Sequence, residues 1–203
     1  MSRLVLCLFL VLPACAAKAP PPSGFLSDYA RLEKVDQSRL RYVSDDLAAY
    51  DAYLIDPVAI RVLNAGLSDA ERSEISRHFH DTLVRILTAH GHMVAEAPGP
   101  RVARVRVALA GATETVWILN LHPAMKLSGI GAGGAAIEGE FLDSVTGEQL
   151  AAWIHAGRGS QFELDTFDSI DDIKDVITRW TEEAVTRLDE LHADSAAIGA
   201  DGG

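Results

Sequence analysis

The segment from residue 169 to 191 most constrains how this chain can fold. Its apolar side chains recur at the spacing of one helical face. They are Ile170, Ile173, Val176, Ile177, Trp180, Ala184, Val185, Leu188 and Leu191. A helix with one apolar face is stable in water only when that face is buried against another layer. The rest of the chain must therefore supply a second layer with an apolar face of its own.

Alternating segments supply that second layer. Ala135–Asp143 and Glu148–Ala156 alternate between apolar and polar residues, and Ser144–Gly147 between them is a turn sequence, so we predict a β-hairpin. Arg101–Ala110 alternates in the same way, which predicts another half-buried strand. Val116–Leu119 is a candidate for one more strand.

A second helix is predicted over residues 68–90. Ser68 and Glu71 form a capping box, in which the serine accepts from the third helical amide and the glutamate reaches back to the cap amide. Gly91 suits the left-handed position that follows a helix.

The segment before that helix completes the predicted sheet. Ala52–Leu63 is rich in strand-forming residues, and Pro57 within it cannot donate to a ladder, which predicts an edge strand or a bulge. We expect residues 33–50 to wrap the surface. The predicted fold is an α+β two-layer sandwich, with a mostly antiparallel sheet of four to five strands packed by helices at about 68–90 and 169–191.

The first fourteen residues have the pattern of a secretory signal. Arg3 precedes the apolar run Leu4–Leu12, which is shorter than the about 20 residues of a membrane-spanning helix. Leu12–Cys15 resembles a lipoprotein box, in which Cys15 becomes the lipidated N-terminus of the mature chain. The alternative is an Ala-x-Ala cleavage site at residues 14–16, which would release a protein without an anchor.

The predicted domain organisation follows from this N-terminus. Residues 1–14 are the signal peptide, and residues 15–23 are a lipidated N-terminus with a proline-rich tether, because such segments are extended spacers. Residues 24–192 form one α+β domain, and residues 193–203 form a disordered tail. Cys15 is the only cysteine after the signal, so a disulfide within the mature chain is excluded.

The charge of the chain limits its partners. The net charge is −11, and loss of Arg3 with the signal makes the mature chain more acidic. Nucleic acids and anionic membrane surfaces require basic patches. We therefore expect no nucleic-acid partner, and contact with a membrane only through the lipid anchor.

The seven histidines do not form a metal-binding pattern. His78 and His80 are two residues apart on the predicted helix, so they do not share a face. His90 and His92 flank the helix end, where histidine suits the unpaired carbonyl groups. We expect surface or capping histidines, and neither a metal nor a cofactor.

Two segments are candidate partner contacts. A glycine-rich loop at residues 129–134 lacks the strand–loop–helix context and the lysine of a phosphate-binding loop, but its small residues allow another backbone to approach. The strand around residues 53–62 is a candidate sheet edge. The candidate contact residues are Gly129, Gly131, Gly133, Gly134, Tyr53 and Pro57.

The hairpin carries the main candidates for catalytic chemistry. Glu138 and Glu140 share one strand face, and paired carboxylates are able to act as acid and base or to bind Ca²⁺. A solvated sheet face is the simpler interpretation, and no Gly-x-Ser-x-Gly motif is present. We expect a non-catalytic domain. The alternative is a small-molecule-binding protein or an enzyme that uses these carboxylates and a histidine in a cleft.

Four stretches resemble a known family. They are Ser23–Tyr29, Tyr53–Val58, Glu138–Glu148 and the helix around Trp180. Together they are similar to the bacterial lipoproteins catalogued as domain of unknown function 3313. The resemblance implies a lipid-anchored envelope protein and supplies no catalytic residues. Without an aspartate after Cys15, the expected location is the periplasmic face of the outer membrane of a Gram-negative cell. The expected partner is an envelope protein, with self-association as an alternative.

Overall fold

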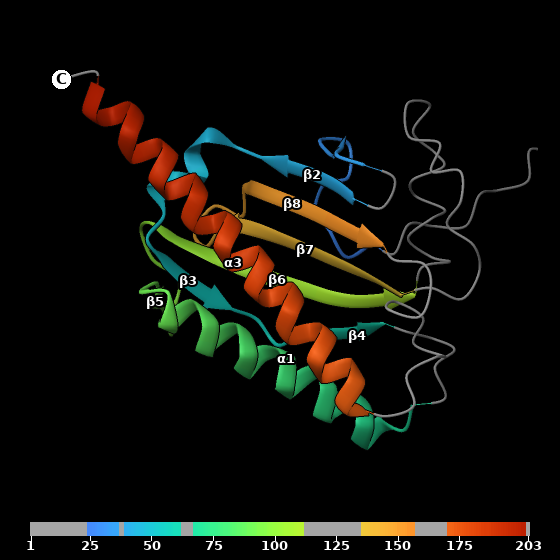
Figure 1. The fold of residues 1–203 in the computed structure, drawn as a ribbon. Helices are drawn as coiled ribbons and strands as arrows, with labels where there is room; N and C mark the ends of the chain where they lie inside the picture. The colour runs from blue at the N-terminus through green and yellow to red at the C-terminus, as the bar shows by residue number, and fades with distance from the viewer. Residues whose placement is uncertain (1–23, 37–38, 62–66, 112–134, 157–169, 202–203) are drawn as a thin grey trace, which may run out of the picture.

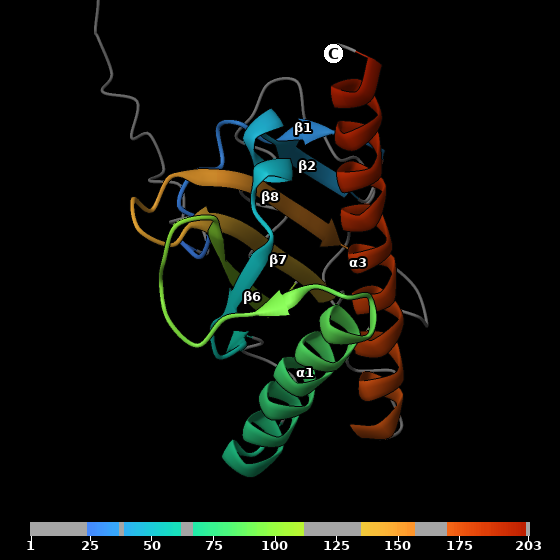
Figure 2. The same ribbon diagram turned by 90° about the vertical axis from the view of Figure 1, so that its left-hand side faces the viewer.

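The computed structural model describes residues 24–36, 39–61, 67–111, 135–156 and 170–201. In these residues one twisted sheet is covered on one face by two helices, α1 (Asp69–Ala89) and α3 (Ile170–Asp201), and on the other by residues 24–32 (Figure 1, Figure 2). The predicted α+β class is confirmed. Val116–Leu119 and the glycine-rich loop at 129–134 lie outside the described residues.

The described sheet has eight strands rather than the predicted four to five. They are β1 (Glu33–Lys34), β2 (Arg39–Val43), β3 (Ala52–Ile55), β4 (Ala59–Arg61), β5 (Met93–Val94), β6 (Val102–Gly111), β7 (Ala135–Asp143) and β8 (Gln149–Ala156). Their order is β1-β2-β8-β7-β6-β3-β5, and β4 also pairs with β6.

The sheet is mixed, which corrects the predicted mostly antiparallel arrangement. Strands β1, β2, β8, β7 and β6 pair antiparallel, whereas β3 pairs parallel to β5 and β6, and β4 pairs parallel to β6. The chain passes from β3 and β4 through α1 before it returns to the sheet at β5 and β6. A helical crossover of this kind brings the chain back in the same direction, so the pairs are parallel.

The hairpin of β7 and β8 is confirmed. Its strands pair antiparallel, and Gly147 in the turn has a φ of 76°, which glycine adopts without strain. The carboxylate of Asp143 accepts hydrogen bonds from the amides of Val145 at 2.8 Å and Thr146 at 2.6 Å. These local bonds close the turn and explain why the sequence pattern was sufficient to locate it.

Strand β2 was missed, because residues 33–50 were expected to wrap the surface. Instead β2 pairs with β8 along its whole length, and Leu40 lies opposite Ile154 in the sheet. A short 3₁₀ helix, η1 (Asp45–Ala49), follows it. The alternation in β2 covers only five residues and includes two arginines, so the pattern alone was too weak to indicate a strand.

The predicted irregularity at Pro57 is confirmed. Strands β3 and β4 both run along β6, and the exposed Pro57 lies in the interruption between them. The prediction that this strand exposes an edge at Tyr53 is wrong. There β3 lies between β5 and β6, and Tyr53 is fully buried.

Helix α1 (Asp69–Ala89) has the predicted capping box. Ser68 Oγ accepts from the amide of Glu71 at 3.3 Å, and the amide of Ser68 donates to Glu71 Oε2 at 2.7 Å. Gly91 has a φ of 85°, as predicted for the residue that follows the helix.

Helix α3 (Ile170–Asp201) begins as predicted but continues ten residues beyond Leu191. The described residues 193–201 are therefore helical, although we expected them to lie in a disordered tail. Figure 1 shows this end of α3 projecting past the sheet. Alanine is frequent in the extension, and its high helix propensity favours continuation without an apolar face to bury. No helix in the described part of the chain is both long and apolar enough to cross a membrane.

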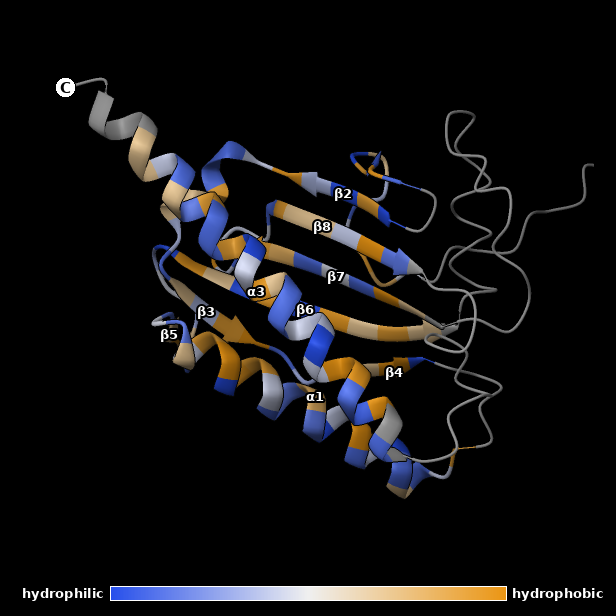
Figure 3. Ribbon diagram, in the orientation of Figure 1, coloured by the Kyte–Doolittle hydropathy of each residue, from blue (hydrophilic) through white to orange (hydrophobic). Residues whose placement is uncertain are grey.

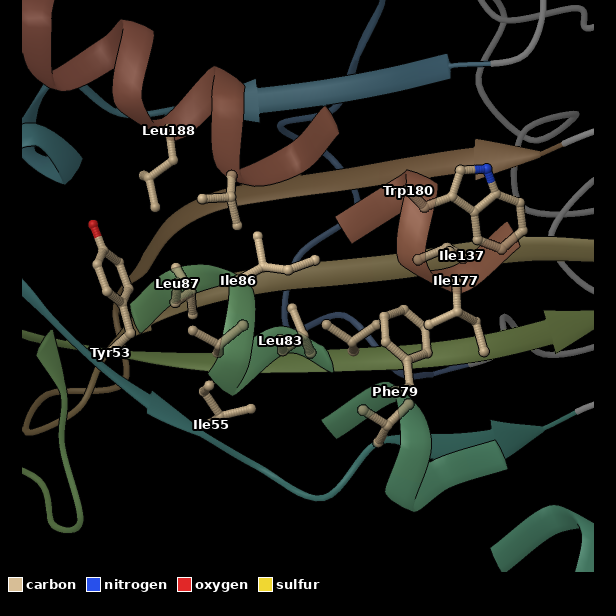
Figure 4. Packing of buried hydrophobic residues seen from close by; sticks show 14 of the residues in the cluster. Tyr53, Ile55, Phe79, Leu83, Ile86, Leu87, Ile137, Ile177, Trp180 and Leu188 are labelled. Atoms are coloured by element: carbon tan, nitrogen blue, oxygen red, sulfur yellow. The ribbon is translucent and has the colours of Figure 1, made fainter. Parts of the chain in front are cut away.

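The main core lies between the helices and the sheet. Tyr53 and Ile55 of β3, Ile137 of β7, and Phe79 and Ile177 of the helices pack together there (Figure 4). Figure 3 shows hydrophobic positions alternating along the strands and gathered on the sheet-facing side of the helices. A smaller cluster on the opposite face contains Phe25, Leu26, Leu32, Leu40, Ala108, Ala152 and Ile154. Both faces of the sheet are therefore buried, not one alone.

Candidate functional site

Glu138 and Glu140 lie on the sheet face opposite the helices, and both are fully buried. Their two-residue spacing on β7 places them on one face, as predicted. The interpretation of that face as solvated is wrong, because residues 24–32 cover it. A buried carboxylate is tolerated when charge partners and hydrogen-bond donors compensate for the water it has lost.

Glu140 is compensated on both of its carboxylate oxygens. Oε2 accepts from the amide of Ser27 at 2.8 Å, from Ser27 Oγ at 2.8 Å and from Gln149 Nε2 at 3.0 Å. Oε1 forms an ion pair with the guanidinium of Arg106. The carboxylate therefore joins the N-terminal segment to β6 and β8.

Glu138 is held by Tyr29 of the same N-terminal segment. The phenol of Tyr29 donates to Glu138 Oε2 at 2.7 Å. Its oxygen also accepts from the amides of Phe25 and Leu26, each at 3.2 Å. One tyrosine thus closes the turn at residues 25–29 and fastens that turn to the sheet.

The ring of Phe25 adds a third attachment. The guanidinium of Arg106 lies 4.9 Å from the ring centroid, and that of Arg61 lies 5.5 Å away. These cation–π distances are favourable, and Phe25 is 6% exposed. Arg106 therefore bridges Phe25 and Glu140. The described residues 24–29 thus meet Glu138 and Glu140 in one cluster, which we call the N-terminal lock.

Gly139 lies between the two glutamates in the sequence and makes its contact on the other face of the sheet. A Cβ atom built on it would lie 2.1 Å from Cζ2 of Trp153, so only glycine leaves room for that indole. Trp153 also contacts Phe141, with ring centroids 5.3 Å apart. The Glu-Gly-Glu sequence thus anchors the N-terminal segment on one face and seats a tryptophan on the other.

A histidine clamp connects α3 to the end of α1. Asp189 Oδ2 lies 2.6 Å from His90 Nδ1, and Asp189 Oδ1 lies 2.7 Å from His92 Nε2. Burial opposes ionisation of Asp189, but hydrogen bonds from the two histidines outweigh it and lower the pKa of this carboxyl. His192 Nε2 lies 2.9 Å from the hydroxyl of Tyr53. Among the described residues, no group of three or more His, Cys, Asp and Glu side chains is arranged to hold a metal ion.

A groove of about 400 Å³ lies on the helix side, between α3 and strands β2 and β8. Its apolar lining includes Val43, Ala151 and Trp153 from the sheet. Ala184 and Leu188 line it from α3. The sequence analysis missed this groove because it missed β2. The alternation from Arg39 to Val43 was the signal that could have located it.

Of the predicted contact residues, the structure describes Tyr53 and Pro57. Cys15 and the loop residues Gly129, Gly131, Gly133 and Gly134 lie outside the described residues. Tyr53 is buried beneath α3, so it is not available as a contact, whereas Pro57 is exposed between β3 and β4.

These features define a class of protein: an α+β domain with a mixed sheet, helices on one face and a locked N-terminal segment on the other. The family model described as "Protein of unknown function (DUF3313)" matches residues 21–184, so the chain belongs to that family. A search of curated proteins finds no match.

Solved structures with similar chains include two bacterial proteins. A dodecamer of PelC from Paraburkholderia phytofirmans, in a form with one substitution, is 13% identical with a TM-score of 0.39, over 71% of this chain and 94% of that chain. A putative neuraminyllactose-binding hemagglutinin homolog from Helicobacter pylori is 11% identical with a TM-score of 0.38, over 75% of this chain and 90% of that chain.

Proposed function

We propose that this protein is a lipid-anchored bacterial envelope protein, whose domain binds an envelope partner without catalysis from the periplasmic face of the outer membrane. Cys15 is the proposed lipidation site, and residues 15–23 are the proposed tether. At about 3.1 Å per residue for an extended proline-rich chain, such a tether holds the domain within roughly 30 Å of the membrane.

The observation that carries this proposal is the N-terminal lock. It begins immediately after the proposed tether, and its residues Ser27 and Tyr29 are fixed to the sheet. Ser27 donates a hydrogen bond to the carboxylate of Glu140, and Tyr29 donates one to the carboxylate of Glu138. These two carboxylates were the main candidates for acid–base chemistry. The paired carboxylates thereby have a structural role in this arrangement, which supports a binding domain over an enzyme.

Strand β4 is the proposed surface for a protein partner. Within the described residues it pairs with β6 on one side, and no second strand pairs with it on the other. Edge strands recognise partners by adding a strand through backbone hydrogen bonds. This edge contains Ile60 and lies within the edge predicted at residues 53–62, although Tyr53 itself is buried.

The anchor is tested by the intact mass of the mature protein from membranes of its own host, compared with a Cys15→Ser variant. The proposal requires the mass of a chain that begins at Cys15 plus acyl groups, and loss of that species in the variant. An unmodified chain that begins after residue 16 would refute the anchor and favour a protein released into the periplasm.

The partner surface is tested by crosslinking in intact cells. A photoreactive amino acid replaces Ile60 on β4, and the matched control replaces the exposed Thr186 on α3. A discrete crosslink to one envelope protein from position 60 and not from position 186 supports the edge. Equal labelling from both positions would contradict it.

A further inference from the structure

The groove between α3 and strands β2 and β8 has no role in the proposed function. Figure 1 shows α3 crossing the sheet beside β2 and β8, and the groove lies between these elements. Four large apolar side chains are exposed in the described part of the chain, and two of them, Val35 and Val43, line this groove. Apolar surface at a concave site favours a ligand over open water.

The groove has an apolar floor and apolar side chains on its α3 wall. Ala151 and Trp153 of β8 form the floor, and Ala184 and Leu188 of α3 form a wall. Ala184 is exposed although it faces the groove, so the space beside it is open to solvent. The position of the indole of Trp153 in this floor depends on Gly139, as described above.

The size of the groove limits the occupant. A volume of about 400 Å³ lies in the range of small-molecule sites. An α-helix with side chains is about 10–12 Å across, which is too wide to enter a space of this volume. A single acyl chain is narrow enough. The groove follows α3 from Trp180 to Asp194, a length of about 21 Å at 1.5 Å per residue.

The charges along the groove suggest the head group. The side chain of Arg39 is paired with Asp36 at 2.5 Å. The side chain of Arg41 forms no hydrogen bond or ion pair with another described residue, although Glu33 lies opposite it across the β1–β2 pair. Arg41 lies directly opposite Trp153 in the paired strands, so its cation stands beside the apolar floor. The acidic side chains that line the groove are on α3, and they are Glu183, Glu190 and Asp194; Arg187 lines it from the same helix. The lining residues of β2 include Arg39 and Arg41 and no acidic residue. An anionic head is therefore favoured on the β2 side.

We propose that this groove binds a free fatty acid, with the acyl chain between α3 and β8 and the carboxylate on Arg41. The site is separate from the N-terminal lock and from the edge of β4. It requires neither the lipid anchor nor a protein partner, so the proposal stands or falls independently of the proposed function.

Binding is tested on the full chain with Cys15→Ser, because bound anchor lipid or detergent would compete with the probe. Laurate should displace the fluorescent fatty acid cis-parinaric acid from this chain at micromolar concentration. The apolar N-terminal run is common to all variants compared, so differences between variants report on the groove. Failure of laurate to displace the probe at any soluble concentration would overturn the proposal.

Two tryptophan substitutions on α3 locate the site. Ala184→Trp fills the groove, and we expect it to weaken laurate binding at least about tenfold, because the acyl chain loses its apolar contact area. Ala193→Trp places the same side chain at an exposed position of α3 that does not line the groove. Circular dichroism confirms that both variants are folded. Equal laurate affinity in the two variants would overturn the proposal.

Two charge reversals test the head group. Arg41→Glu should weaken binding of laurate about tenfold and leave binding of the neutral lauryl alcohol unchanged, because only laurate carries a carboxylate. Arg179→Glu, on an exposed part of α3 outside the groove, should change neither. If light scattering instead shows a dimer that Ala184→Trp dissociates, and laurate does not bind, the groove is a self-association surface and the proposal is wrong.

Discussion

The hydroxyl of Tyr29 donates a hydrogen bond of 2.7 Å to the buried carboxylate of Glu138, which lies 109 residues further along the chain. This bond joins the first described turn of the domain to the centre of the sheet. It shows that the segment after the proposed tether is an integral part of the fold. The stability of the domain should therefore depend on side chains at its very beginning.

Tyr29→Phe should lower the free energy of unfolding by about 1–3 kcal/mol, because it leaves a buried carboxylate without one of its donors. Urea denaturation measures this change. Tyr42→Phe is the matched control, since the hydroxyl of Tyr42 accepts from Arg31 in an exposed pair and its loss should cost less than about 0.5 kcal/mol. Equal effects of the two substitutions would argue against the lock.

Arg106→Ala should be more destabilising, by about 3–5 kcal/mol, because Glu140 then remains buried without its cation. The comparison is with Arg104→Ala on the same strand. Arg104 pairs with Asp56 in a half-exposed ion pair, for which about 0–1 kcal/mol is expected. If the two variants have the same denaturant midpoint, the guanidinium of Arg106 contributes little to the stability of the fold.

Gly139→Ala should destabilise the domain by about 1–3 kcal/mol, because the new methyl group collides with the indole of Trp153 and forces it to move. In a Trp153→Leu background the added cost of the alanine should fall, which a double-mutant cycle measures. Gly99→Ala is the control, since its Cβ would meet Val102 only at 3.6 Å, an ordinary contact. If Gly139→Ala lowers the free energy of unfolding equally with and without Trp153→Leu, the collision with the indole is not the cause.

Asp143 should make the stability of the domain dependent on pH in the acid range. The hydrogen bond from Tyr50 and those from the turn amides lower its pKa to about 2. A carboxyl whose pKa is depressed by folding stabilises the fold above its unfolded pKa of about 4, and this contribution is lost as the pH falls toward 2.

The measurement is the urea midpoint between pH 2 and pH 6. Asp143→Asn should flatten the dependence while its amide oxygen still accepts from the turn, and Tyr50→Phe should flatten it in part. The exposed Asp175→Asn on α3 serves as the control. A profile for Asp143→Asn that parallels the original chain would place the titrating group elsewhere.

Local patterns were the most informative part of the sequence. The capping box at Ser68, the Ser144–Gly147 turn and the interruption at Pro57 were all predicted and confirmed. Each depends on residues within a few positions of one another, such as the bond between Ser68 and Glu71. The family resemblance was also confirmed, although the role of its shared stretches was not evident until they were seen in contact.

The candidate site was much less predictable. Glu138 and Glu140 were correctly placed on one strand face, but whether that face is solvated depends on a segment more than 100 residues away. His90 and His92 were expected at a helix end, and their shared partner Asp189 lies on another helix. No local pattern indicates such pairings.

The sequence by itself therefore determined where α1, the β7–β8 hairpin and the start of α3 lie, because helical periodicity, strand alternation and caps are properties of neighbouring residues. The tertiary structure alone decided that the sheet is mixed, that β2 joins it and that two glutamates are buried beneath the N-terminal segment. The physical reason is that burial and charge pairing depend on which distant segments pack together, and each segment carries only its own half of that contact.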